Sequence, residues 1–236
     1  MKQIILPFRT GKPLLTDVPA PSVQPGTVLI RTAASVISTG TERMLIDFGK
    51  ANWWGKIQQQ PEKVKQVLDK IKTDGISPTI RAVRSKLDKP IPLGYSQAGV
   101  IVAVGAGIQD LKIGDRIASN GTHAELVCVP RNLVARIPDN VPDESAAFTV
   151  LGAIALQGIR LAQPTLGETI VVYGLGLIGQ LTAQLLLANG CRVLGIDLKE
   201  GRLQKAADKG VEPIRNATEE QIKSLTNGFG ADAVII

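Results

Sequence analysis

The strongest constraint on the fold is a glycine-rich turn between an apolar run and an apolar helical segment. Ile170–Tyr173 is typical of a buried parallel strand, and Leu177–Ala188 has helical character. Between them, Gly174, Gly176 and Gly179 have the spacing G-x-G-x-x-G. Glycines also cluster in ordinary turns, but strand, turn and helix in this order predict a unit that binds the diphosphate of a dinucleotide.

Each glycine of this turn has a separate physical role. Gly174 permits the tight turn, Gly176 lets the backbone approach a pyrophosphate, and Gly179 lets the helix pack closely on the strand. The helix N-terminus presents N–H groups and the positive end of its dipole to the phosphates. We therefore expect the main chain of the whole turn to bind the cofactor, which adds Leu175, Leu177 and Ile178 to the site.

A second apolar strand, Arg192–Asp197, ends in a carboxylate eighteen residues after the last glycine of the turn. Such a carboxylate can accept hydrogen bonds from a ribose 2′-hydroxyl, and it repels a 2′-phosphate, so Asp197 favours NAD over NADP. Lys199 and Arg202 follow closely, belong to the expected cofactor site, and partly offset that repulsion. The alternative role for Asp197 is a helix cap.

Composition describes an ordinary globular protein. Its 236 residues suffice for one large or two modest domains, and 44% are hydrophobic and 20% charged. No apolar run approaches the ~20 residues of a membrane span, and the apolar stretch at the N-terminus is too short for a secretory signal. Cys128 and Cys191 both lie in strand-like apolar context, so we expect buried free thiols and a cytoplasmic protein.

The net charge of +6 is concentrated in residues 50–90, which contain ten lysines and arginines but only four acids. No nucleic-acid-binding motif accompanies them, so nucleic acid is not an expected partner. One interpretation, which includes Phe48, Trp53 and Trp54, is a lid or docking surface for an anionic partner such as a nucleotide sugar or an acidic lipid headgroup. The favoured one is a solvated helical face, with the tryptophans in its core or in an oligomer contact.

Patterning divides the rest of the chain into a β-rich and an α/β part. Strands are expected at 3–6, 27–32, 99–104, 116–118, 124–129 and 133–137, with a proline-rich turn region between the first two. Val64, Val67, Leu68 and Ile71 predict an amphipathic helix, and a second, shorter helix follows it. A further helix is expected over 144–161.

After Asp197 the pattern predicts helix 201–209, strand 211–214, helix 219–226 and strand 232–236. A complete doubly wound nucleotide-binding domain has six strands, and only four can be counted. An exposed apolar sheet edge is a hazard that folded proteins avoid. We therefore expect the chain to be a fragment whose nucleotide-binding sheet is truncated at its fourth strand.

Several local strings resemble the medium-chain dehydrogenase/reductase superfamily, which includes the zinc-type alcohol dehydrogenases. They are Pro92–Gly105, Leu111–Ile117, Thr122–Pro130 and Glu144–Ala153. The resemblance implies an α/β protein with a β-rich domain. A GroES-like β-barrel at 1–150, with a helical insert at 45–90, would precede an incomplete Rossmann domain at 151–236. It also implies a cleft between the two halves in which substrate meets nicotinamide.

The insert, together with Ser38–Met44 before it, resembles a subgroup of bacterial proteins. In that subgroup this dehydrogenase half is often joined to a sugar-oxidoreductase half of the Gfo/Idh/MocA kind. The resemblance implies a sugar or sugar-nucleotide substrate in the synthesis of cell-envelope polysaccharide.

The chain departs from the zinc-type pattern at each metal-ligand position. Ser38 lies where the family has a cysteine, Tyr95-Ser96 replaces His-Glu, and Leu151 or a neighbour replaces the third ligand. Zinc needs thiolate, imidazole or carboxylate ligands, and the chain has only two cysteines and one histidine. We expect no zinc and no other metal.

Without a metal, another group must stabilise the charge that develops on the substrate oxygen. Tyr95 is the first candidate because the resemblance places its hydroxyl near the vacated metal position. Thr41 corresponds to the family's proton-relay hydroxyl if one residue is inserted, and Glu42 would orient either group or the substrate. The alternative for all three is a loop residue that satisfies local hydrogen bonds. For His123, the single histidine, a structural or surface role is favoured over acid/base chemistry.

The resulting hypothesis is an NAD(P)-dependent, zinc-independent dehydrogenase or reductase. It would act on an alcohol/carbonyl pair in a small molecule, which is anionic or a carbohydrate, and it could form a homo-oligomer. The alternatives are an enoyl or quinone reductase, which also works without metal, and a nucleotide-binding module that has lost its chemistry.

Overall fold

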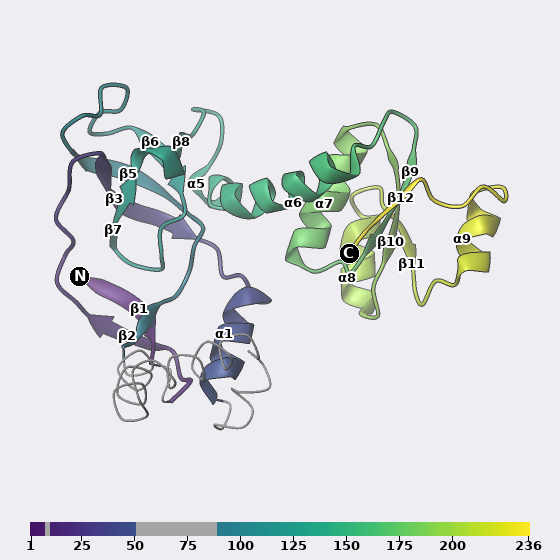
Figure 1. The fold of residues 1–236 in the computed structure, drawn as a ribbon, viewed down its shortest axis with the longest axis horizontal. Coiled ribbons are helices and arrows are strands. Elements are labelled where there is room, and N and C mark those ends of the chain that lie inside the picture. Colours follow the sequence, from purple (N-terminus) through teal and green to yellow (C-terminus); the bar gives the residue numbers. More distant parts are fainter. Residues whose placement is uncertain (8–9, 51–88) are drawn as a thin grey trace, which may run out of the picture. The chain divides into compact units, whose positions relative to one another are not determined.

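A computed structural model describes residues 1–7, 10–50 and 89–236 of the chain (Figure 1). It separates into two compact units, residues 1–148 and 149–236. The predicted amphipathic helix at Val64–Ile71, the shorter helix after it, and Trp53 and Trp54 lie outside the described residues.

A five-stranded antiparallel sheet with the order β7-β3-β5-β6-β8 forms the centre of unit 1. Its strands are β3 (Thr27–Ser35), β5 (Gln97–Val104), β6 (Arg116–Ser119), β7 (Leu126–Pro130) and β8 (Val134–Arg136). Val28 and Ile30 alternate along β3 and pack with Ile101 and Ile117 in one core. Register shifts at Leu29/Ile30 and Thr32/Ala34 interrupt the β3–β5 pairing, and such irregularities bend a strand and increase its twist. The sheet is therefore curled, as predicted for the β-rich domain.

A second, three-stranded sheet in unit 1 has the order β2-β1-β4. Its strands are β1 (Lys2–Leu6), β2 (Leu14–Asp17) and β4 (Ile91–Pro92). The sequence pattern did not predict β2, which was assigned to the proline-rich turn region. Leu14 and Leu15 are both exposed, so the strand lacks the apolar alternation that marks a half-buried strand.

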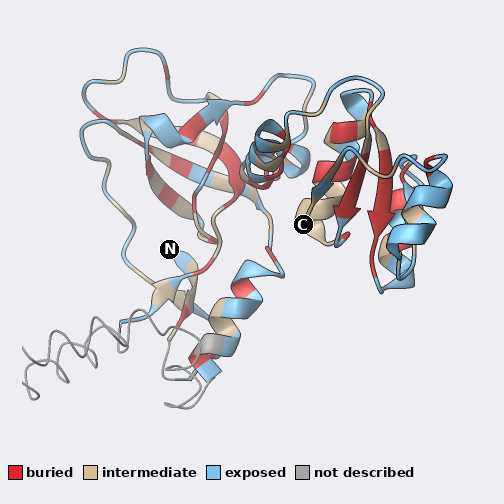
Figure 2. Cartoon of the chain, turned by 45° about the vertical axis from the view of Figure 1, so that its right-hand side comes forward, coloured by how far each residue is buried: buried red, intermediate tan, exposed pale blue. Residues whose placement is uncertain are grey.

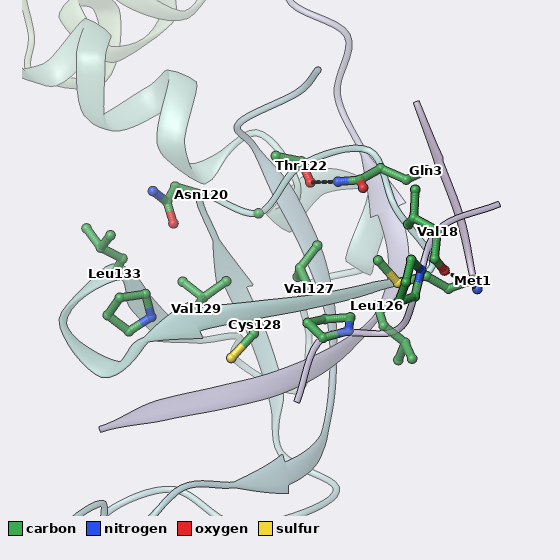
Figure 3. A pocket seen from close by; sticks show the side chains of 14 residues that line it. Met1, Gln3, Val18, Asn120, Thr122, Leu126, Val127, Cys128, Val129 and Leu133 are labelled. Atoms are coloured by element: carbon green, nitrogen blue, oxygen red, sulfur yellow. Dashed lines mark hydrogen bonds between the residues drawn. The ribbon is translucent and has the colours of Figure 1, made fainter. Parts of the chain in front are cut away.

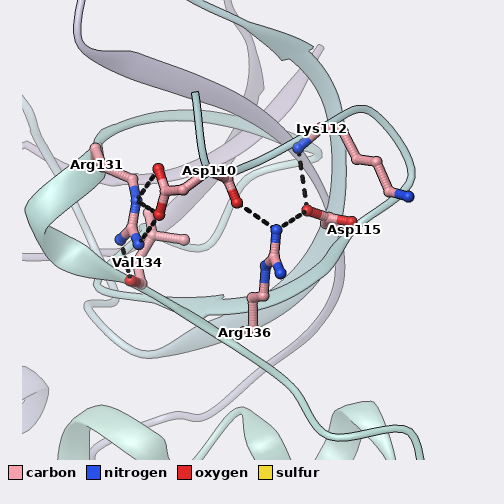
Figure 4. Close-up of polar contacts among 6 residues, drawn as sticks. All are labelled: Asp110, Lys112, Asp115, Arg131, Val134 and Arg136. Atoms are coloured by element: carbon pink, nitrogen blue, oxygen red, sulfur yellow. Dashed lines mark hydrogen bonds and ion pairs between the residues drawn. The ribbon is translucent and has the colours of Figure 1, made fainter. Parts of the chain in front are cut away.

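Ion pairs connect the loop before β6 to the end of the sheet (Figure 4). The Arg131 guanidinium pairs with the Asp110 carboxylate, and Arg136 on β8 pairs with Asp115 at 3.1 Å. The guanidinium of Arg131 holds the pKa of Asp110 below its usual value. These contacts lie at the surface, where ion pairs contribute little to stability.

The helix predicted over residues 144–161 is two helices, so its predicted continuity was wrong. They are α5 (Asp143–Ala146), in unit 1, and α6 (Thr149–Ala162), in unit 2. At the break, the Ala147 carbonyl accepts a hydrogen bond from the Ser96 hydroxyl at 2.5 Å. This tertiary contact, which periodicity does not reveal, uses a backbone group that a continuous helix would bond internally.

Unit 2 is a parallel sheet with the order β11-β10-β9-β12 and helices between its strands. The strands are β9 (Thr169–Tyr173), β10 (Arg192–Ile196), β11 (Glu212–Ile214) and β12 (Ala233–Ile235), and the later helices are α7 (Leu177–Ala188), α8 (Glu200–Ala207) and α9 (Glu219–Leu225). Most residues of β9 and β10 are buried (Figure 2). They belong to two core clusters, one on each face of the sheet. The predicted order of strands and helices is confirmed within two residues at each boundary.

Neither cysteine forms a disulfide; Cys191 is buried as predicted, whereas Cys128 is only half-buried. Among the helices of residues 1–7, 10–50 and 89–236, none combines the length and the apolar character that crossing a membrane requires.

Candidate functional site

The glycine turn of unit 2 connects β9 to α7, and its three glycines have different surroundings. Gly174 has φ +95°, a conformation that L side chains rarely adopt. A Cβ at Gly179 would lie 1.9 Å from the Gly174 carbonyl oxygen, so helix and strand approach each other too closely for any side chain. A Cβ at Gly176 would meet nothing within 4 Å. Its surroundings are therefore open enough for a ligand to reach the backbone.

Helix α7 begins directly after its N-cap residue, Gly176, which has no side chain to cap the helix. The first N–H groups of a helix have no partner within the helix, so the first turn of α7 presents donors to an anion. Leu177 and Ile178 belong to that turn. The N–H of Leu175 differs, because it donates to Asp197 Oδ2 at 2.9 Å.

Asp197 follows β10 and is buried, with 8% of its surface exposed. Its Oδ1 accepts the Lys199 N–H at 2.8 Å, and its Oδ2 is 3.1 Å from the Arg202 guanidinium. Burial alone raises the pKa of this carboxyl group. The N–H of Lys199, the Arg202 guanidinium and the N–H of Leu175 outweigh burial, and the pKa lies below its usual value. The carboxylate is therefore ionised at neutral pH.

These contacts place the carboxylate against the glycine turn. Strands β9 and β10 are parallel neighbours, so their carboxyl ends meet at one edge of the sheet. The turn and Asp197 thus form one cradle in unit 2, to which Arg202 adds a positive charge beside the acid. Asp197 does not cap α8, whose N-cap residue is Lys199.

In unit 1, the predicted catalytic residues lie together around the Tyr95 hydroxyl. That hydroxyl donates to Ser38 Oγ at 2.7 Å and is 3.3 Å from Thr41 Oγ1. Tyr95 is half-buried, Ser38 is buried and Thr41 is exposed. The arrangement is a cluster of three hydroxyl groups at the start of α1 (Thr41–Lys50).

Glu42 lies behind this cluster and is 5% exposed. Its Oε1 accepts the Ser38 N–H at 2.8 Å, and its two carboxylate oxygens are 3.3 and 3.2 Å from His123 Nε2. His123 is itself 7% exposed, and its Nδ1 is 2.8 Å from Ser35 Oγ. The histidine is therefore buried, which contradicts the surface alternative of the expected structural or surface role and leaves the structural one.

The contact between Glu42 and His123 joins residues 81 apart in the chain. No spacing in the sequence indicated it, and the single histidine was assigned a role without a partner. The one local signal is Gly94, whose φ is +88° and whose Cβ would lie 2.7 Å from the His123 ring. A glycine before Tyr95 is needed because the imidazole occupies that space.

The hydroxyl cluster around Tyr95 is not a set of ligands that suits a zinc ion. The groups nearest the Tyr95 hydroxyl are the hydroxyls of Ser38 and Thr41, whereas zinc prefers thiolate, imidazole and carboxylate. Glu42 and His123 are two groups of suitable type. Throughout the described ranges, no cluster of three or more histidine, cysteine, aspartate or glutamate residues could hold a metal ion.

A cavity of about 470 Å³ lies elsewhere in unit 1, between the N-terminal segment and β7 (Figure 3). Its lining is mostly apolar and includes Val18, Leu126 and Cys128, with a hydrogen bond from Gln3 Nε2 to Thr122 Oγ1 at 3.2 Å on one side. None of the predicted site residues lines it.

Two family descriptions match this chain: "Alcohol dehydrogenase GroES-like domain" over residues 63–139 and "Zinc-binding dehydrogenase" over residues 178–236. A mycocerosic acid synthase-like polyketide synthase of Mycobacterium tuberculosis is 32% identical over 61% of the chain and 7% of its own length. The (R,R)-butanediol dehydrogenase of Neisseria gonorrhoeae is 26% identical over 95% of the chain and 67% of its own length.

Among solved structures, galactitol-1-phosphate dehydrogenase from Escherichia coli superposes with a TM-score of 0.73 at 21% identity. The match covers 99% of this chain and 67% of that one, and it shows a shared fold. The chain thus spans about two thirds of the dehydrogenases it matches. The two family matches and the fold of both units make the chain similar to the zinc-type alcohol dehydrogenase-like members of the medium-chain dehydrogenase/reductase superfamily.

Proposed function

We propose that this chain is the cofactor-binding and catalytic part of an NAD(P)-dependent oxidoreductase that works without zinc on an alcohol/carbonyl pair. The observation that carries the proposal is the cradle of unit 2, in which the open surroundings of Gly176 lie beside the ionised carboxylate of Asp197. The first turn of α7 would hold the diphosphate, and Asp197 would accept a hydrogen bond from a ribose hydroxyl. Bound nicotinamide supplies the redox chemistry by exchanging a hydride with the substrate.

The carboxylate of Asp197 makes NAD the preferred cofactor. A 2′-phosphate would place two negative groups together, and the ion pair to Arg202 relieves only part of that repulsion. NADP therefore binds more weakly and is not excluded.

Tyr95 is the proposed proton donor in the reductive direction. When bound reduced nicotinamide supplies a hydride to the carbonyl carbon, the carbonyl oxygen would take the proton of the Tyr95 hydroxyl, which would leave a phenolate. The hydroxyls of Ser38 and Thr41 can rotate to donate to that phenolate, because both lie within 3.3 Å of the tyrosine oxygen. Water then returns the proton, and the oxidative direction reverses these steps. Zinc is not needed because the hydroxyl cluster replaces the Lewis acid.

The substrate class follows from the resemblance, which suggests a sugar or sugar nucleotide. Butanediol dehydrogenase acts on a diol by its name, and a polyol or sugar alcohol carries the same vicinal hydroxyl chemistry. Such a substrate is a small polar molecule, so a panel of polyols, sugars and nucleotide sugars is the first set to test.

NADH titration of the complete protein, followed by nicotinamide fluorescence, tests the proposal. We expect saturable binding that is at least about tenfold tighter than binding of NADPH.

Tyr95→Phe should leave NADH affinity unchanged and lower kcat about 100-fold, the usual contribution of a positioned general acid. Thr41→Ala should have a smaller effect, and Thr39→Ala, which removes an exposed neighbouring hydroxyl, should have none.

Each rival function gives a different result in the same assays. Turnover of a conjugated enone but not of alcohols or carbonyls would identify an enoyl or quinone reductase. Unchanged activity in Tyr95→Phe, Thr41→Ala and Glu42→Ala would contradict the assigned chemistry. Loss of activity with a zinc chelator, restored by zinc alone, would contradict the metal-free mechanism.

A further inference from the structure

We infer that Glu42 and His123 form a buried positioning pair that sets the hydrogen-bonded geometry of the Tyr95 hydroxyl. The role of the pair in turnover rests on the proposed function, but its effect on Tyr95 does not. The inference concerns one contact: the carboxylate of Glu42 lies 3.2 and 3.3 Å from His123 Nε2, and both side chains are more than nine-tenths buried.

The pair touches both chain segments that build the hydroxyl cluster. On one side, Glu42 Oε1 accepts the Ser38 N–H at 2.8 Å, and the Glu42 N–H donates to the Ser38 carbonyl at 2.9 Å. These two bonds close residues 38–42 into one turn. Ser38 and Thr41, the two acceptors near Tyr95, therefore move with the Glu42 carboxylate.

On the other side, His123 is fixed to the segment that carries Tyr95. The His123 N–H donates to the Leu93 carbonyl at 2.8 Å, and Gly94 lies so close to the ring that no side chain would fit there. Displacing the imidazole would displace Gly94 and the tyrosine that follows it. His123 thus contacts the segment that carries Tyr95 directly, and through Glu42 it contacts the turn that accepts the hydrogen bonds of the tyrosine.

Hydrogen bonding defines how the pair acts. A carboxylate only accepts, so the imidazole must present an N–H at Nε2, and Ser35 Oγ, 2.8 Å from Nδ1, completes the ring's bonding. Glu42 reaches Ser38 through the main-chain N–H, while Tyr95 reaches Ser38 through the side-chain oxygen. The contacts therefore form no continuous path for a proton, and the pair positions Tyr95 instead of exchanging a proton with it.

Geometry of this kind matters because proton transfer requires heavy atoms within hydrogen-bond reach, and small displacements lower rates steeply. Glu42 and His123 are more than nine-tenths buried, so water has little access to replace a lost contact between them. Removing one partner leaves a buried polar atom of the other unpaired, although Glu42 keeps the Ser38 N–H and His123 keeps Ser35 Oγ. We expect the turn to shift until that atom finds a new partner.

Tyrosine labelled with ¹³C at the ring carbon that bears the hydroxyl provides a direct readout. The chain has two tyrosines, so Tyr95→Phe assigns the Tyr95 resonance. We expect His123→Phe and Glu42→Gln to shift that resonance. Asp47→Asn, which changes an exposed carboxylate on the same helix, should leave it in place.

His123→Gln keeps a donor near the Nε2 position and should return the resonance most of the way. An unmoved Tyr95 resonance in folded His123→Phe and Glu42→Gln would overturn the inference, whatever the activity.

Turnover gives the second readout. We expect His123→Phe to lower kcat about 10- to 100-fold with KM changed less than about twofold, and His123→Gln to recover most of the loss. In the Tyr95→Phe background, His123→Phe should cost less than about threefold, because the group it positions is gone. Equal losses in both backgrounds would show a general structural role and overturn the inference. Should Tyr95→Phe itself leave activity intact, the proposed function fails and the spectroscopic result still decides the positioning role.

Discussion

The three glycines in the turn between β9 and α7 are required for different physical reasons. Gly174 is needed for its backbone conformation, Gly179 for the contact of the helix with the Gly174 carbonyl, and Gly176 for the open space around it. The first two roles concern folding and the third concerns the ligand. Substitution by alanine therefore separates stability from cofactor binding at neighbouring positions.

Gly179→Ala should destabilise unit 2 by about 1–3 kcal/mol, since the new Cβ would overlap a backbone oxygen that cannot move freely. Gly176→Ala is the matched control, because it adds the same methyl group where nothing lies within 4 Å. It should change stability by less than about 0.5 kcal/mol and weaken NADH binding at least about tenfold. Urea unfolding and NADH titration measure the two effects, and full NADH affinity in Gly176→Ala would refute its assignment to the diphosphate site.

The start of α5 depends on an arginine from the sheet of unit 1. Arg116 on β6 donates through Nε and Nη2 to Asp143 Oδ1, at 3.0 and 2.7 Å, and through Nη2 to the Val141 carbonyl at 2.6 Å. Asp143 is the first residue of α5, where a negative charge interacts favourably with the helix dipole. One guanidinium thus holds a helix of a single turn, too short to be stable by itself, against a strand.

Replacing this guanidinium by an ammonium tests the connection between the two elements. Arg116→Lys should lower the free energy of unfolding by about 1–2 kcal/mol, since a lysine cannot reproduce the planar set of donors. Arg43→Lys is the control, because Arg43 pairs with Asp47 at 3.5 Å on the exposed side of α1. This substitution should lower the free energy of unfolding by less than about 0.5 kcal/mol. Urea denaturation followed by circular dichroism compares the variants, and equal costs would show that the Arg116 contacts are not specific.

At the scale of the whole molecule, each of the two units has its own core, so they can respond differently to solution conditions. In unit 2, two carboxylates hold β10 to its neighbours: Asp197 contacts the glycine turn, and Glu212 on β11 pairs with Arg192 on β10 at 2.6 Å. The Arg192 guanidinium holds the pKa of Glu212 below its usual value, and the pKa of Asp197 is also lowered.

Lowered carboxylate pKa values predict the sign of the pH dependence. Unfolding raises both pKa values to those of free side chains, near 4, so the unfolded unit binds more protons at acid pH. The stabilisation is complete above about pH 5 and is lost as the pH falls through the folded-state values. We expect the urea concentration at the unfolding midpoint of unit 2 to decrease when the pH is lowered below 5. The decrease should be less steep in Asp197→Asn. An unchanged slope in that variant would show that Asp197 is not the responsible group.

How much the sequence alone predicts differs between the two units. In unit 2, the apolar strands, the helices and the glycine turn follow one another locally, and side-chain periodicity together with glycine spacing predicted them. In unit 1, the exposed strand β2 was missed and the break between α5 and α6 was not foreseen. Strand β2 was missed because Leu14 and Leu15 are exposed and give no apolar alternation. The break depends on a contact between distant segments, the bond from Ser96 to the Ala147 carbonyl.

The amino-acid sequence by itself determined the curled β domain, the order of the parallel α/β unit, and the residue types of both candidate sites. It also indicated Tyr95, Thr41 and Glu42 as candidate catalytic residues. Only the tertiary structure decided that the hydroxyls of Tyr95 and Thr41 meet, and that Glu42 pairs with His123 where both side chains are buried. Local pattern reports which face of an element is buried. It carries no information on which polar groups find each other across the fold, because such partners are chosen by packing and by the cost of leaving a buried group unpaired.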